Sequence, residues 1–155
     1  MDAERRLEDL GIVLPPSWQA PSGLNFATAS RCGNLLFLSG HGPARADGTW
    51  ITGRLGRDLS IEQGYEAARL TGLNLLATTR AALGSLDAVG RVVKVLGMVA
   101  CTEDFHDMPQ VINGASDLFV AVFGEAGRHA RSAVGLVSLP MNIPVEIEMI
   151  VEVRE

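Results

Sequence analysis

Aromatic residues, cysteines and long apolar runs are all scarce in this chain of 155 residues. Aromatics make up only 5% of it, so we expect a mainly aliphatic core. The two cysteines, Cys32 and Cys101, cannot form a disulfide framework and lie outside any C-x-x-C pair, which indicates reduced thiols. No apolar run reaches the ~18 residues that a membrane-spanning helix needs. We therefore expect neither a disulfide-rich domain nor a membrane protein.

Runs of basic residues are missing as well. The 13 lysines and arginines are scattered, and the net charge is −5, so no part of the chain could neutralise a series of phosphates. The first residues, MDAERRLEDLGIVLPP, are charged and lack the apolar core of a secretory signal. We expect a cytoplasmic protein that binds neither membranes nor nucleic acid.

The motifs of common cofactor and metal enzymes are absent too. The chain contains no G-x-G-x-x-G, Walker A, G-x-S-x-G or H-E-x-x-H pattern. Its three histidines, at positions 41, 106 and 129, lack the local spacing of metal ligands. We therefore expect no cofactor and no metal.

What the chain does have is the size and balance of one globular domain. Hydrophobic residues make up 47% of it and charged residues 20%. A chain of this length buries roughly 70% of its unfolded surface. We expect one domain over residues 1–155, with residues 1–20 as an N-terminal extension packed on it.

Hydrophobic periodicity predicts a series of alternating strands and helices. The helices are expected at 3–10, at 61–82 after a capping box that begins at Ser60, and at 109–123 with Asp107 as its cap. Strands are expected at 23–30, 35–40 and 89–101, with a turn at 32–34, a long loop over 41–58 that contains a short strand near Trp50, and two more strands at the C-terminus.

This order of elements favours the α+β class, with one mixed sheet and two helices packed on one of its faces. So short a chain supplies no third layer for the other face, which would carry valine and methionine side chains. We therefore expect a homo-oligomer in which a second copy covers that face.

The strands at the C-terminus, within HARSAVGLVSLPMNIPVEIEMIVEV, hold the candidate functional side chains. Arg131 is the one charge on a row of small and apolar residues. It is either a strand-end arginine that reaches the surface or a bidentate receptor for a small carboxylate. Glu148 and Glu152 fit an amphipathic strand that shows its carboxylates to water. Glu146 differs because it lies beside the preceding loop, where sites are commonly built.

Geometry limits how Arg131 and Glu146 could cooperate. In a tight hairpin Glu146 would pair near Ser138, which places it roughly 23 Å from Arg131 at ~3.3 Å per residue. No small substrate spans that distance. Either the two strands are not neighbours in the sheet, or the two residues meet across a subunit boundary.

Several segments together resemble the RidA/YjgF family of reactive-intermediate deaminases, whose members were once labelled translation inhibitors or endoribonucleases. The similar segments are GNLLFLSGH (33–41), DLSIEQGYEAARLTGLNLL (58–76), RVVKVLGMV (91–99), VINGASDLF (111–119) and ARSAVGLVSLPMNIPVEIE (130–148). The most specific part is Ala-Arg-Ser followed, fifteen residues after the arginine, by the first glutamate of V-E-I-E. The segment GEAGRHARSAVG is similar to a subgroup of longer members.

This resemblance implies a chorismate-mutase-like fold, assembled as a homotrimer with clefts between subunits. Active members hydrolyse 2-imino acids, or their enamine tautomers, to 2-keto acids and ammonia without a metal or cofactor. By resemblance, Arg131 would bind the substrate carboxylate and Glu146 would position or activate water. Further candidate pocket residues are Phe26, Ser39, Gly40, Asn113, Ser132 and Ala133.

Three positions depart from the family pattern. Phe26 stands where many deaminases have tyrosine, Ala133 where they often have cysteine, and His41 where glutamine is usual. Two further hypotheses stay beside imine hydrolysis, the first from these departures and the second from the older name of the family. One is a binding or regulatory protein that retains the carboxylate clamp without turnover. The other is an endoribonuclease, which the net charge disfavours.

Overall fold

In the computed structural model, which describes residues 2–155, five strands form one mixed sheet. They are β1 (Ala29–Cys32), β2 (Leu35–His41), β3 (Val89–Ala100), β4 (Ala130–Leu136) and β5 (Val145–Val153). Their order across the sheet is β1-β2-β5-β3-β4, and only β3 and β4 pair in parallel. β4 and β5 thus flank β3 on opposite sides. The predicted α+β class is confirmed.

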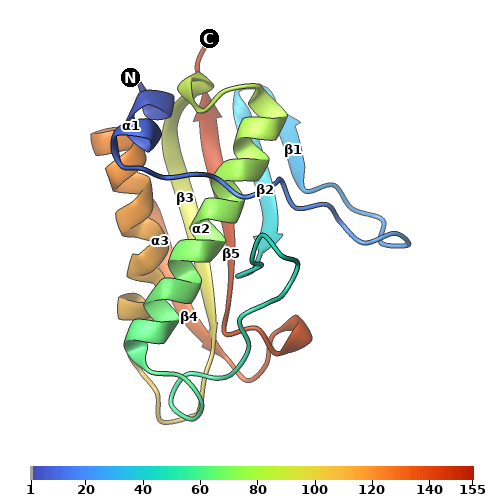
Figure 1. Cartoon of the computed structure of the whole chain (residues 1–155), viewed down its shortest axis with the longest axis vertical. Coiled ribbons are helices and arrows are strands. Elements are labelled where there is room, and N and C mark those ends of the chain that lie inside the picture. Colours follow the sequence, from blue (N-terminus) through green and yellow to red (C-terminus); the bar gives the residue numbers. More distant parts are fainter. Residues whose placement is uncertain (1) are drawn as a thin grey trace.

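Three α-helices accompany this sheet: α1 (Ala3–Asp9), α2 (Ile61–Leu83) and α3 (Met108–Phe123). α2 and α3 lie side by side across one face, as predicted, and α1 packs near the end of α3 (Figure 1). Short 3-10 turns follow three of the elements, at Leu86–Ala88, Gly124–Gly127 and Pro140–Asn142.

Local sequence signals account for most of the helix ends. The Ser60 side chain accepts a hydrogen bond from the backbone amide of Gln63, and the Gln63 side chain accepts one from the backbone amide of Ser60. These two bonds form the predicted capping box. α2 ends at Gly84 in the left-handed conformation, at φ 84°. Asp107 does precede α3, but its side chain makes no capping hydrogen bond. The prediction that Asp107 caps the helix is therefore wrong in its mechanism.

The first predicted strand begins later than the sequence pattern indicates. β1 starts at Ala29, and residues 24–28 form no strand. A β-bulge after Leu38 breaks the register of the neighbouring strand. Beyond it, Ser39 donates its amide to the Thr28 carbonyl and its hydroxyl to the Ala27 carbonyl, so a side-chain contact replaces regular pairing there. The short strand expected near Trp50 is a single bridge with Ala44.

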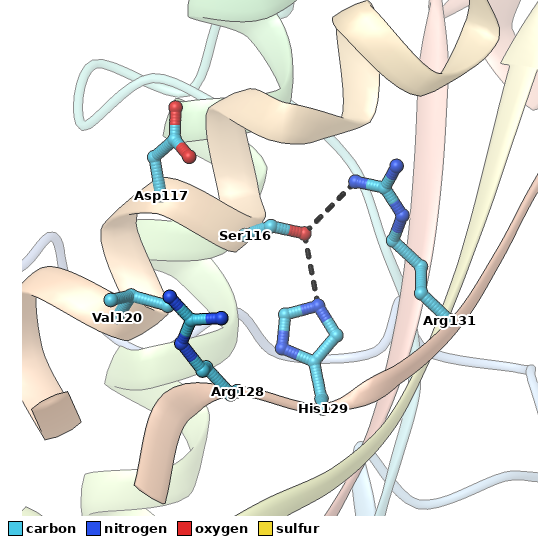
Figure 2. Close-up of a pocket in the computed structure, with 6 residues that line it drawn as sticks. All are labelled: Ser116, Asp117, Val120, Arg128, His129 and Arg131. Atoms are coloured by element: carbon cyan, nitrogen blue, oxygen red, sulfur yellow. Dashed lines mark hydrogen bonds between the residues drawn. The ribbon is translucent and has the colours of Figure 1, made fainter. Parts of the chain in front are cut away.

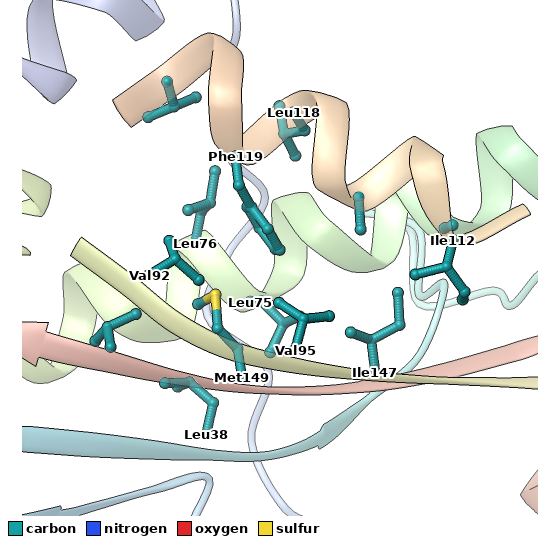
Figure 3. Packing of buried hydrophobic residues seen from close by; sticks show 14 of the residues in the cluster. Leu38, Leu75, Leu76, Val92, Val95, Ile112, Leu118, Phe119, Ile147 and Met149 are labelled. Atoms are coloured by element: carbon teal, nitrogen blue, oxygen red, sulfur yellow. The ribbon is translucent and has the colours of Figure 1, made fainter. Parts of the chain in front are cut away.

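The core lies between the sheet and the two long helices. Phe119 and Ile112 of α3 point toward strand residues that include Val95 and Met149 (Figure 3). The packing of this core also requires that α2 and α3 approach closely at Gly114. A Cβ atom at that position would lie 2.0 Å from the Tyr65 carbonyl oxygen. The buried set is mainly aliphatic, as the composition predicts.

No helix covers the opposite face of the sheet in the described part of the chain. Phe37 of β2 and Val134 of β4 are both 41% exposed. We call this surface the open face. Among residues 2–155, no helix is long and apolar enough to cross a membrane.

Candidate active site

Arg131 lies on the helix-covered face of the sheet. In β4 it pairs with Val95, a fully buried residue of β3 whose side chain points toward the helices. From there the guanidinium reaches α3, where its Nη1 donates to Asn113 Oδ1 at 2.9 Å. The same Nη1 donates to Ser116 Oγ at 3.1 Å (Figure 2). Both acceptors are neutral, so the full positive charge of Arg131 remains available.

His129 continues this chain of hydrogen bonds. Its Nδ1 lies 2.7 Å from the Gly127 carbonyl oxygen, and its Nε2 lies 2.9 Å from Ser116 Oγ. Because a carbonyl only accepts, we assign the proton to Nδ1, and Nε2 then accepts the Ser116 hydroxyl proton. Burial lowers the pKa of His129, and the nearby Arg131 cation lowers that pKa further. A neutral His129 therefore turns the lone pairs of Ser116 toward Arg131.

These residues line a surface hollow of about 470 Å³, which we call the arginine hollow. The Nε and Nη2 groups of Arg131 have no hydrogen-bond partner within residues 2–155. A guanidinium with one edge held and another free suits bidentate binding of a carboxylate. Arg128, on the rim of the same hollow, pairs with Glu125 instead, at 3.3 Å.

Glu146 lies on the open face, near the start of β5. It pairs with Met98 and alternates with the fully buried Val145 and Ile147, whose side chains point the other way. Its carboxylate lies against Gly40, where a Cβ atom would come within 2.7 Å of Oε1. Burial raises the pKa of Glu146, and the negative charge of Glu148 raises it further. Glu146 is thus a stronger base than an ordinary glutamate.

A second hollow of about 370 Å³ surrounds Glu146, and its walls are mostly apolar. We call it the glutamate pocket. Trp18 lies in its wall, stacked 6.3 Å from Phe26 and edge-on at 5.6 Å to His41, while Trp50 lines another side. His41 is only 2% exposed and hydrogen-bonded through both ring nitrogens, and its burial lowers its pKa. It serves as a neutral, fixed part of this wall.

Within one chain Arg131 and Glu146 cannot share a substrate. They are two strands apart across the sheet and three residues apart along it, which separates their backbones by about 14 Å. Their side chains also point to opposite faces. The sequence left two alternatives: that the strands of Arg131 and Glu146 are not neighbours, or that the residues meet across a subunit boundary. The first is confirmed, because β3 lies between β4 and β5.

The remaining candidate residues lie in different surroundings. Phe26 and Gly40 line the glutamate pocket, and Asn113 holds Arg131. Ser39 donates its hydroxyl to Ala27 and lines a separate small hollow on the open face. Beyond these, Ser132 is exposed on the open face, whereas Ala133 packs against the core on the helix side.

Among the residues of the two hollows that sequence reasoning missed, four bear on the proposed chemistry. His129 lies two positions before Arg131, so strand alternation could have placed it on the same face. Ser116 lies three positions after Asn113, which is one turn along the same side of α3. No sequence pattern predicts that Trp18 and Trp50 line the glutamate pocket. Both lie in irregular segments that only the fold brings together.

Comparison with known proteins identifies the family. Residues 4–153 match the family model described as "YjgF/chorismate_mutase-like, putative endoribonuclease". The chain belongs to the YjgF/chorismate mutase-like family. Protein TCP17 from Trypanosoma cruzi, a curated relative, is 42% identical over 149 residues, which cover 96% of this chain and 92% of TCP17.

Solved structures of similar proteins share the fold over nearly the whole length. Atu1372 from Agrobacterium tumefaciens, a protein of unknown function, is 44% identical, with a TM-score of 0.87, and the match covers 97% of this chain and 91% of Atu1372. A protein from Shewanella oneidensis is 32% identical, with a TM-score of 0.91 and coverage of 97% and 99%. The YjgF-like fold expected from the sequence is therefore confirmed.

Proposed function

We propose that this YjgF-family protein hydrolyses 2-imino acids to 2-keto acids and ammonia at sites formed between copies of the chain. One observation carries the proposal. Arg131 and Glu146 lie in separate hollows on opposite faces of one sheet. Each hollow holds one of the two groups that the reaction needs, so a complete site requires the arginine hollow of one copy and the glutamate pocket of another.

Arg131 binds the carboxylate of the substrate in this account. Asn113 and Ser116 fix one edge of its guanidinium and leave the other edge for the ligand. A substrate held at a fixed cation no longer has to find its orientation, which lowers the barrier of the following step. The neutral state of His129 supports this role. Its Nε2 accepts the Ser116 hydroxyl proton, so the lone pairs of Ser116 Oγ face Arg131 and hold the guanidinium in place.

Glu146 then acts as the general base. It takes a proton from water while the water oxygen forms a bond to C2 of the protonated imine, which gives a tetrahedral carbinolamine. The same carboxyl group returns the proton to the nitrogen and, again a carboxylate, takes the hydroxyl proton as the C2–N bond breaks, so that the C2 carbonyl forms and ammonia leaves. Transfer of that last proton to ammonia or water restores the carboxylate. The raised pKa of Glu146 suits both halves of this proton shuttle.

The open face supplies a surface on which copies can assemble. Phe37 and Val134 are large exposed apolar side chains on it, and Met98 and Ile150 add half-buried apolar area. Burial of such a patch is a common basis of closed oligomers. We propose the homotrimer that the family resemblance implies, with three equivalent sites.

The test is imine hydrolysis by the purified protein. Imines made in situ by a dehydratase should lose ammonia faster with the protein than without it. Arg131→Ala should reduce kcat/KM by at least about a hundredfold through lost carboxylate binding. Equal inertness of wild type and Arg131→Ala across short and branched imines would refute the proposal.

A binding protein without turnover is the second candidate, and Phe26 and Ala133 favour it because they lack a hydroxyl and a thiol. It predicts that 2-keto acids raise the melting temperature of the wild type but not of Arg131→Ala, with no turnover of any imine. RNA cleavage, which the family description names, fits poorly with a net charge of −5 and scattered basic residues.

A further inference from the structure

The walls of the glutamate pocket are more aromatic than the rest of the chain. Aromatic residues make up 5% of the sequence, and both of its tryptophans line this hollow, where they separate it from a smaller one that they line as well. Phe26 stacks on Trp18, and the apolar side chains of Leu24, Met141 and Ile143 add to the lining beside two prolines. Glu146 is the one carboxylate among the lining residues.

Two features of the backbone and the exposure of two apolar side chains mark this pocket. Gly42 leaves room for Trp50, since a Cβ atom there would lie 2.9 Å from the indole ring. Met141, on the rim, has a positive φ of 58°, a strained conformation for a residue with a long side chain. Leu24 and Phe26 remain 53% and 46% exposed, although apolar side chains of this size are usually covered.

From these observations we infer that the glutamate pocket selects 2-imino acids with bulky apolar or aromatic side chains over those with one or two side-chain carbons. The inference rests on the proposed function, because it concerns the same site. A hollow of about 370 Å³ is far larger than a methyl or ethyl group requires. A branched or aromatic side chain would fill it and displace water from the indole and phenyl faces.

Burial of each further methylene should multiply kcat/KM by roughly four, as long as the pocket has room. The imine of leucine or phenylalanine should therefore exceed the imine of alanine by at least about tenfold in kcat/KM. Both imines can be generated by one amino-acid oxidase with catalase present, so that the source of the imine does not bias the comparison.

Two variants connect this preference to the pocket. Trp50→Ala and Leu24→Ser should each lower the ratio of kcat/KM for the leucine imine to that for the alanine imine by about fivefold or more. Leu24 is half-exposed, so its replacement keeps the test valid if Trp50→Ala does not fold. Val13→Ala is the matched control, because Val13 is 89% exposed in the same N-terminal segment and outside the pocket. It should leave the ratio unchanged.

Tryptophan fluorescence gives a second readout that does not depend on turnover. Since both tryptophans line the pocket, 4-methyl-2-oxopentanoate should change the emission at a concentration at least about tenfold lower than pyruvate. Hydrolysis of the alanine imine as fast as the leucine imine, or faster, would overturn the inference and leave the proposed function standing. If no imine is hydrolysed, the proposed function fails, and equal or absent fluorescence responses to the two keto acids would overturn the inference as well.

Discussion

The base strength of Glu146 comes from its surroundings in the folded chain. Burial is the larger cause of its raised pKa, and the neighbouring charge of Glu148 adds to it. Because the base must be unprotonated to act, activity should fall with decreasing pH while the solution is still above the ordinary glutamate pKa of 4.5. The acid limb of the pH–rate profile therefore reports the environment of this one carboxyl group.

Glu148→Gln removes the negative charge that helps to raise the pKa of Glu146 and leaves the burial of Glu146 in place. The pKa of Glu146 should fall, so the acid limb of kcat/KM should move to lower pH. Measurement of kcat/KM across the acid range for wild type and variant checks this. Glu152→Gln is the control, since Glu152 lies on the same strand face but its carboxylate pairs with Arg91 at 3.0 Å. An acid limb that stays in place or moves upward in Glu148→Gln would contradict the assignment of Glu146 as the base.

Gly40 allows the Glu146 carboxylate to lie where it does. Gly40→Ala would place a Cβ atom 2.7 Å from Oε1, and the flexible end of the glutamate would move away at little cost in stability. A base displaced by about 1 Å should lower kcat/KM roughly a hundredfold. In the Glu146→Gln background Gly40→Ala should have almost no further effect, because the group that it displaces has already lost its function. Equal losses in both backgrounds would show that Gly40 acts in some other way.

At the scale of the elements, α2 and α3 depend on close contact. A Cβ atom at Gly114 would lie 2.0 Å from the Tyr65 carbonyl oxygen, and a backbone atom cannot yield as a side chain does. Gly114→Ala should lower the free energy of unfolding by about 3 kcal/mol, measured by chemical denaturation. At Gly72 the nearest atom is the end of the Leu118 side chain, at 3.0 Å, so Gly72→Ala should cost less than about 1 kcal/mol. Similar losses in both variants would contradict this account of the helix contact.

The sequence predicted the elements well where the pattern is regular. Periodic apolar residues and a capping box located α2 within one residue of its end at Leu83, and β3 and α3 were found almost as closely. The prediction of a strand over 23–30 was wrong for most of that segment. The bulge and the Ser39 hydroxyl, rather than the alternation of apolar residues, decide where β1 begins. The prediction that the Asp107 side chain caps α3 was wrong because residue type does not determine the direction of a side chain.

The candidate site was predictable only in part. Arg131 and Glu146 stand out as charges in apolar strands, and distance alone argued against a simple hairpin. That they point to opposite faces depends on the register of the sheet, in which they pair with Val95 and Met98, three positions apart on β3. Trp18 and Trp50 reach Glu146 from segments without any periodic pattern, so no local rule could have assigned them.

At the scale of the whole molecule, the open face is the surface on which assembly should depend. Phe37→Asp places a charge on this apolar face, so it should weaken the oligomer and lower activity per chain by at least about tenfold. Analytical ultracentrifugation should give three times the 16.5 kDa chain mass for wild type and a lower mass for the variant. Val13→Asp, at an apolar residue that is 89% exposed outside this face, should keep the wild-type mass. A monomeric, fully active wild type would contradict the intersubunit site.

Complementation between two inactive variants tests the central claim most directly. Arg131→Ala and Glu146→Gln should each be inactive alone. When equal amounts are unfolded and refolded together, each site would have an intact arginine and an intact glutamate in about one quarter of cases, because the two residues come from different chains. Recovery of about one quarter of wild-type imine hydrolysis is the predicted result. Mixed oligomers that form without any recovered activity would contradict a site shared between copies.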